Sequence, residues 1–164
     1  ELSRISPPTS GDNVQLPGDW MGGSMFLIDE AETMSLSGRS GGVAIKGLSE
    51  QELRTVMYLV GFPNLLVSLH PDYVMTHRMT PLAPDRTYVE CTWAFPKDAV
   101  ERPDFDPSYA VDFWDLTNRQ DWAACESVQR GLSSPHAQPG PLAPEEEGVY
   151  QFVTRVARAY AGNR

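Results

Sequence analysis

Several features that mark common protein classes are missing from this sequence. It has no apolar run approaching the ~18 residues that a membrane-spanning helix requires, and nothing in it resembles a signal peptide. It also lacks basic runs and interleaved basic and aromatic residues, and its net charge is −9. We therefore expect a cytoplasmic protein that binds neither nucleic acid nor a membrane.

Cysteine is scarce as well. Only Cys91 and Cys125 are present, and neither lies in a Cys-x-x-Cys or Cys-x-His pattern. Zinc or iron–sulfur ligation by residues of this chain is therefore not expected. A disulfide between them stays open, but two buried thiols of a cytoplasmic protein are the better interpretation.

The residues that are present suffice for one domain with a substantial core, since 41% of the 164 are hydrophobic. Fourteen prolines and 13 glycines indicate a loop-rich domain. The chain opens with ELSRISPPTSGDN and has no initiator methionine, so it reads as a loop from within a longer protein. We therefore expect a fragment.

The order of segments predicts an antiparallel sheet packed by two helices, an α+β fold. Residues 1–23 are rich in Pro, Gly and Ser and are expected to be an irregular arm. Residues 24–96 are expected to form consecutive antiparallel strands, since apolar and β-branched runs alternate with turn residues. The strand-like runs are 24–36, which is a strand or a hairpin, and 54–62, 64–70, 71–82 and 86–95. A capping box of Ser49 with Glu52 predicts a short helix between the first two.

Two longer helices are predicted after the strands, over 108–132 and 144–162. Pro144 suits the first position of the second helix, and the three glutamates that follow suit its dipole. The expected buried face of this helix consists of Val149, Phe152, Val153, Val156 and Tyr160.

Two polar residues stand on the apolar face of the first helix. At helical spacing this face reads Val111, Trp114, Asn118, Asp121, Cys125, Val128 and Leu132. A carboxylate on a buried face costs free energy unless it is paired or binds a metal, so Asp121 needs a partner. From spacing alone, that partner is an ordinary arginine or backbone amide.

The inward face of the sheet and the first helix leave room for an apolar pocket that Asp121 can reach. By residue type, we expect it to be lined by Met75, Trp93, Phe113, Trp114, His70 and His77. On one continuous strand the two histidines would face opposite sides, because their offset is odd. Each is interpreted as a structural or pocket histidine rather than a metal ligand.

The segments NRQDWAACESVQRGLSS and PGPLAPEEEGVYQFV resemble the C-terminal signature of Rieske non-haem iron oxygenase α subunits, the ring-hydroxylating family. FPNLLVSLHPDYVMTHRMTPLAPDRT and DWMGGSMFL also resemble segments of this family, so the resemblance covers nearly the whole chain. It implies a helix-grip catalytic domain in which two histidines and one carboxylate hold mononuclear Fe(II). By position, the carboxylate maps to Asp121.

The same resemblance implies that most of the metal site lies elsewhere. The two iron histidines and the Rieske [2Fe–2S] domain would precede this segment, so residues 1–164 would be the C-terminal part of the catalytic domain. The isolated fragment is therefore expected to be inactive. Asn118, one turn before Asp121, would orient the site or border the pocket together with Trp114, Met75 and His70.

The intact enzyme would take electrons from a ferredoxin or reductase and use Fe(II) and O2 to hydroxylate an aromatic or similarly apolar small molecule. Family members are often homotrimers. A second hypothesis is a non-catalytic helix-grip module for small ligands, in which Asp121 would only anchor a polar group of the ligand.

Overall fold

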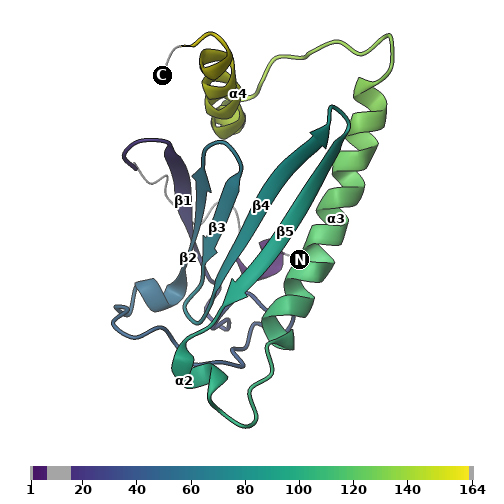
Figure 1. Cartoon of the computed structure of the whole chain (residues 1–164). Helices are drawn as coiled ribbons and strands as arrows, with labels where there is room; N and C mark the ends of the chain where they lie inside the picture. Colours follow the sequence, from purple (N-terminus) through teal and green to yellow (C-terminus); the bar gives the residue numbers. More distant parts are fainter. Residues whose placement is uncertain (1, 7–15, 163–164) are drawn as a thin grey trace. The chain divides into compact units, whose positions relative to one another are not determined.

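A computed structural model describes residues 2–6 and 16–162 of the chain (Figure 1). They form two compact units, residues 1–124 and 125–164, which are described separately. The first unit holds α1 (Leu2–Ile5), β1 (Trp20–Phe26), the 3₁₀ helix η1 (Glu52–Arg54), β2 (Thr55–Gly61), β3 (Leu65–Leu69), β4 (Val74–Ala83), β5 (Arg86–Ala94), α2 (Lys97–Val100) and most of α3 (Ser108–Leu132).

The five strands form one sheet in the order β1-β2-β3-β4-β5, and each strand is antiparallel to the next. The predicted α+β class with an antiparallel sheet and helices is thus confirmed, and Figure 1 shows the early turns of α3 running beside β4 and β5. Among the described residues, no helix has the length and apolar character needed to cross a membrane.

The first strand differs from the prediction at both ends. It begins at Trp20, inside the expected arm, and ends at Phe26 instead of continuing to residue 36. The glycines that suggested an irregular arm serve close strand pairing, because a Cβ at Gly22 would lie 2.4 Å from the Tyr58 carbonyl oxygen of β2. Composition alone does not separate a glycine in a loop from one that lets two strands approach.

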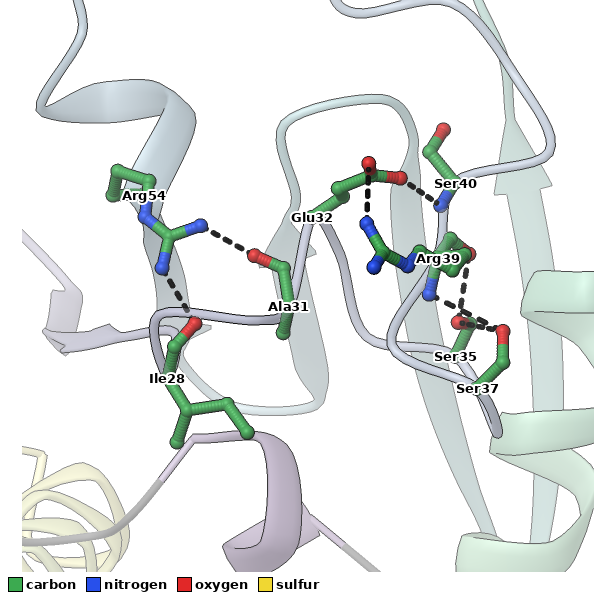
Figure 2. Close-up of polar contacts among 8 residues, drawn as sticks. All are labelled: Ile28, Ala31, Glu32, Ser35, Ser37, Arg39, Ser40 and Arg54. Carbon is green, nitrogen blue, oxygen red and sulfur yellow. Dashed lines mark hydrogen bonds and ion pairs between the residues drawn. The ribbon is translucent and has the colours of Figure 1, made fainter.

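Residues 27–51 form a loop that side-chain hydrogen bonds hold in place (Figure 2). The Arg54 guanidinium of η1 donates to the carbonyl oxygens of Ile28 and Ala31. Further along, the Glu32 carboxylate accepts hydrogen bonds from the Arg39 side chain and the Ser40 backbone N–H, both at 3.0 Å. The Ile28 and Ala31 carbonyl oxygens and the Ser40 N–H are thereby satisfied without a strand partner.

The same loop is joined to the helix side of the molecule by a buried carboxylate. Asp72, only 2% exposed, accepts hydrogen bonds from three hydroxyl groups, those of Thr33 (2.5 Å), Ser40 (2.5 Å) and Tyr109 (2.9 Å). The Asp72 carboxylate raises the pKa of Tyr109 in addition to the effect of burial, so this phenol stays protonated. The cluster joins the loop, the β3–β4 turn and the first turn of α3.

The register of the sheet defines which side chains share one face. One row across the strands reads Tyr58, Ser68, Met75 and Trp93, and the next reads Val60, Leu66, His77 and Cys91. The buried core draws on this face, on the loop and on α3, and its largest members are Trp114, Tyr73, Phe113, Met34 and Met75.

The second unit contains the end of α3, the 3₁₀ helix η2 (Pro144–Glu146) and α4 (Glu147–Tyr160). The expected buried face of α4 is wrong for the described residues: Val149, Val153 and Tyr160 are exposed, and Phe152 and Val156 are half-buried. An amphipathic pattern identifies the side of a helix that can be buried, but burial also needs a covering element.

Candidate functional site

The buried face of α3 is shorter than the sequence pattern predicts. Its buried residues are Ala110, Phe113, Trp114, Thr117 and Asn118, whereas Asp121, Cys125, Val128 and Leu132 are exposed. The expected burial of Asp121 is therefore wrong, and so is the expected burial of the Cys125 thiol. Both cysteines are free, as expected, and Cys91 is half-buried. The apolar pattern continues along α3 beyond the part that the sheet covers.

Asn118 is the last residue of α3 that contacts the sheet through a hydrogen bond among the described residues. Its Oδ1 lies 2.9 Å from Nε2 of His77 on β4, and its Nδ2 lies 3.6 Å from Sγ of Cys91 on β5. Because the Asn118 amide nitrogen donates to the sulfur, its oxygen faces His77 and accepts the Nε2–H proton. The Asn118 side chain thus bridges two neighbouring strands.

The two strand histidines lie on the same side of the sheet, contrary to the prediction. The backbone does not run as one strand between them, because His70 follows β3 and its N–H closes a turn onto the Tyr73 carbonyl oxygen. Both rings therefore contact Trp114, with centroid separations of 5.7 Å for His70 and 5.9 Å for His77. The prediction of opposite faces was wrong because it took residues 70–77 as one continuous strand.

Trp114 lies at the centre of these contacts. Its Nε1–H donates to the Tyr73 hydroxyl at 2.9 Å, and that hydroxyl donates to the Met34 carbonyl oxygen at 2.7 Å. His70 stacks on Tyr73 with ring centroids 4.1 Å apart. Met75, fully buried on β4, lies between Ser68 and Trp93 in the cross-strand row.

His70 is the most unusual group of the site. It is 3% exposed, and neither ring nitrogen has a hydrogen-bond partner. Burial lowers its pKa to about 3, so the ring is neutral at neutral pH. A buried neutral imidazole with both nitrogens free costs stability, which makes it a candidate for a functional role.

Other buried polar atoms near the sheet–helix interface are also without partners. They are the Tyr58 hydroxyl on β2, Nε1 of Trp93 on β5 and the Thr117 hydroxyl on α3. Burial raises the pKa of Tyr58, so the phenol is protonated. With His70, these groups form a set of neutral hydrogen-bonding atoms that bound water or a ligand can satisfy.

Asp121 is one helical turn beyond Asn118. Its carboxylate makes no hydrogen bond and no ion pair with any other described residue, so the arginine or backbone amide suggested by spacing is not its partner. Within residues 2–6 and 16–162, no three His, Cys, Asp or Glu side chains gather in a way that could hold a metal. Asp121 is therefore available as one metal ligand and would need others.

An open cavity of about 410 Å³ lies elsewhere in the first unit, between residues 43–46 and 94–98. None of the predicted site residues lines it. The cavity and the unpaired buried polar groups therefore lie in different parts of the first unit. We place the candidate site at the polar groups, because unpaired buried polar groups indicate a functional site more specifically than cavity size does.

Comparison with known proteins adds a family match. The family model described as "Ring hydroxylating alpha subunit (catalytic domain)" matches residues 1–162. A glycine betaine monooxygenase oxygenase subunit of Chromohalobacter salexigens is 31% identical over 128 residues, which are 77% of this chain and 29% of that protein. The same subunit of Pseudomonas aeruginosa UCBPP-PA14 is 31% identical over 130 residues, 79% of this chain and 30% of that protein.

A more distant relative is the chloroplastic choline monooxygenase of Spinacia oleracea. It is 29% identical over 102 residues, which are 58% of this chain and 22% of that protein. The chain thus spans less than a third of the length of the curated relatives that it matches.

Proposed function

The chain belongs to the ring-hydroxylating oxygenase α subunits, and from that premise we propose that it supplies the carboxylate ligand, Asp121, to a mononuclear Fe(II) site. The observation that carries this proposal is the state of Asp121. Its carboxylate is exposed and unpaired among the described residues, one turn beyond the last residue of α3 that is bonded to the sheet. A facial Fe(II) site needs one carboxylate oxygen beside two imidazoles, with open positions left for other ligands.

The two histidine ligands would come from the oxygenase polypeptide outside residues 1–164, in keeping with the small share of the relatives' length that this chain covers. Bound iron would supply the activation of O2, and a Rieske cluster fed by a ferredoxin or reductase would supply the electrons. The role of this chain's own residues is to hold the carboxylate and to shape the substrate chamber beside it.

The substrate that the residues favour is a small quaternary ammonium compound rather than a neutral aromatic molecule. The relatives are named as monooxygenases of glycine betaine and of choline, both of which carry a trimethylammonium group. Aromatic faces attract such cations by the cation–π interaction. Tyr58, His70, Trp93 and Trp114 gather at the interface between the sheet and α3, and we propose that their rings supply such faces to a bound cation.

The charges of the site suit a cation as well. His70 is neutral because of its low pKa, so this ring does not repel a positive group. The nearby carboxylate of Asp121 and the net charge of −9 favour approach of a cation. We propose that Trp114, Met75 and His70 border the substrate, and that Asn118 borders it too while its amide stays bonded to the sheet.

A matched pair of ligands tests this substrate class. Glycine betaine and 3,3-dimethylbutanoate have the same shape and the same carboxylate, but only the first carries a positive charge. We expect the intact oxygenase to bind glycine betaine roughly five- to thirtyfold more tightly, because cation–π attraction at a desolvated site contributes about 1–2 kcal/mol. Calorimetry gives the dissociation constants, and substrate-dependent O2 uptake shows turnover.

Choline and 3,3-dimethylbutan-1-ol form a second pair that separates the cation from the acid group. Benzoate serves as the neutral-ring control. Equal affinity for the quaternary ammonium compound and its carbon analogue in each pair, together with O2 uptake on benzoate alone, would contradict the quaternary ammonium proposal and favour an aromatic substrate.

A further inference from the structure

The carboxylate of Asp121 lies on an exposed turn of α3. Asn118 is buried, whereas the following turn, including Arg119, Asp121 and Trp122, is exposed. Among the described residues, Arg119 bonds only within the helix, to Asp115 at 2.8 Å. The direction in which Asp121 points is therefore determined by how the preceding turn is attached to the sheet.

In that turn, the hydrogen-bonded part of the attachment to the sheet is the Asn118 amide. From this geometry we propose that His77 and Asn118 are positioning residues, which fix the carboxylate of Asp121 through the hydrogen bond from β4 to α3. The inference rests on the proposed role of Asp121 and adds two residues that do not themselves touch the metal. It assigns to His77 a role that the sequence pattern did not indicate.

The bond is well suited to this task because both partners are restrained. The His77 ring also contacts Trp114, one turn earlier on α3, at a centroid distance of 5.9 Å and nearly perpendicular to it. Asn118 is restrained a second time through Cys91 on β5. A side chain held at both ends resists rotation of the helix. Groups that bond directly to a metal ligand typically contribute 10–100-fold to metal affinity, and we place the expected effect of His77 at the lower end of this range because it acts through the helix.

If the His77–Asn118 bond only stabilised the fold, then loss of another bond between α3 and the rest of the fold should have the same effect. Tyr73 offers this control. One turn earlier, Tyr73 bonds Trp114 and so also joins α3 to the rest of the fold, at 2.9 Å. Tyr73→Phe removes that bond and leaves the Met34 carbonyl oxygen and the Trp114 N–H without a partner. It should therefore lower thermal stability at least as much as loss of the His77 bond, while the turn that carries Asp121 keeps its own anchor.

The experiment measures Fe(II) affinity and thermal stability on the intact oxygenase polypeptide. The protein is stripped of mononuclear iron and titrated anaerobically with Fe(II). His77→Phe keeps a ring against Trp114 but has no donor, and it should raise the Fe(II) dissociation constant at least tenfold. His77→Gln can donate to Asn118 and should restore most of the affinity. Tyr73→Phe should stay within twofold of the wild type despite its lower melting temperature.

Each other outcome has a defined meaning. If Asp121→Ala abolishes Fe(II) binding but His77→Phe leaves it unchanged, the positioning inference is wrong and the proposed function stands. If Asp121→Ala binds Fe(II) normally, the proposed function itself is wrong. Equal loss of Fe(II) affinity in His77→Phe and Tyr73→Phe would show that both variants lose affinity because the fold is less stable. That result would also refute the inference. Should His77→Phe fail to fold, Asn118→Ala removes the same bond from the helix side and is judged by the same criterion.

Discussion

His70 shows most clearly how function and stability compete at a single residue. Its ring stacks on Tyr73 and meets Trp114 and Tyr58 edge-on, so it contributes to packing. Both of its nitrogens are nevertheless unpaired in the interior. A phenylalanine would pack in a similar way without this cost, and we therefore interpret the imidazole as retained for its hydrogen-bonding capacity.

The low pKa of His70 predicts a pH dependence of stability. Its folded-state pKa of about 3 lies below the ordinary value of 6.5, so between these values the unfolded chain binds a proton that the folded chain does not. The stability contributed by neutral His70 is complete above pH 6.5 and is lost as the pH falls towards 3, by at most about 1.4 kcal/mol per pH unit.

Urea unfolding of the iron-free protein between pH 7.5 and 5, followed by tryptophan fluorescence, measures this slope. We expect His70→Phe to reduce it by about 1 kcal/mol per pH unit below pH 6. His136→Asn removes an exposed histidine and should leave the slope unchanged. Identical slopes for the wild type and His70→Phe would mean that His70 is not buried as described.

At the scale of elements, the loop of residues 27–51 has the most consequence for the fold. It holds four fully buried residues, Ala31, Thr33, Met34 and Ser35. Its closing part passes over Tyr109 at the start of α3, where Gly41 and Gly42 let the backbone approach the ring. The loop thereby fixes the start of the helix whose later turn carries Asp121.

Gly41→Ala tests that close approach. An added Cβ would lie 2.6 Å from Cδ1 of Tyr109, whose ring is held by the bond to Asp72. We expect a loss of about 1–3 kcal/mol in the free energy of unfolding, as for other overpacked interiors. The control is Gly140→Ala, where an added Cβ meets nothing within 4 Å, and it should change stability by less than about 0.5 kcal/mol. Equal effects of the two substitutions would show that the loop does not press on Tyr109.

Local patterns predicted several elements of the fold. The helix of residues 108–132 coincides with α3, and the alternating run at 86–95 becomes β5. The Ser49–Glu52 capping box forms with both of its hydrogen bonds, ahead of the short η1. Each of these signals involves residues a few positions apart, which is the range over which sequence periodicity carries information.

The parts that escaped prediction depend on contacts between distant residues. The extent to which the sheet covers α3 determines that Asn118 is buried and Asp121 is exposed, and periodicity treats the two alike. The bond between His77 and Asn118 joins residues 41 positions apart. The anchoring of residues 27–51 by Arg54 likewise replaces a strand that composition favoured.

At the scale of the whole molecule, the proposed function makes the chain one contributor to a larger site. The family match covers residues 1–162, yet the residues that align with the relatives make up less than a third of the relatives' own length. The described residues offer one free carboxylate at the site and, among themselves, no cluster of three metal-binding side chains. In the proposed function, α3 therefore holds the carboxylate, and the other ligands come from the rest of the oxygenase.

The iron content of an Asp121 variant tests this account most directly. We predict that Asp121→Ala in the intact oxygenase loses the mononuclear iron, measured by elemental analysis after dialysis, and loses hydroxylation. The visible absorbance of the Rieske cluster and the melting temperature should stay close to those of the wild type, because the Asp121 side chain is exposed and unpaired among the described residues. Full retention of the mononuclear iron in this variant would contradict the account.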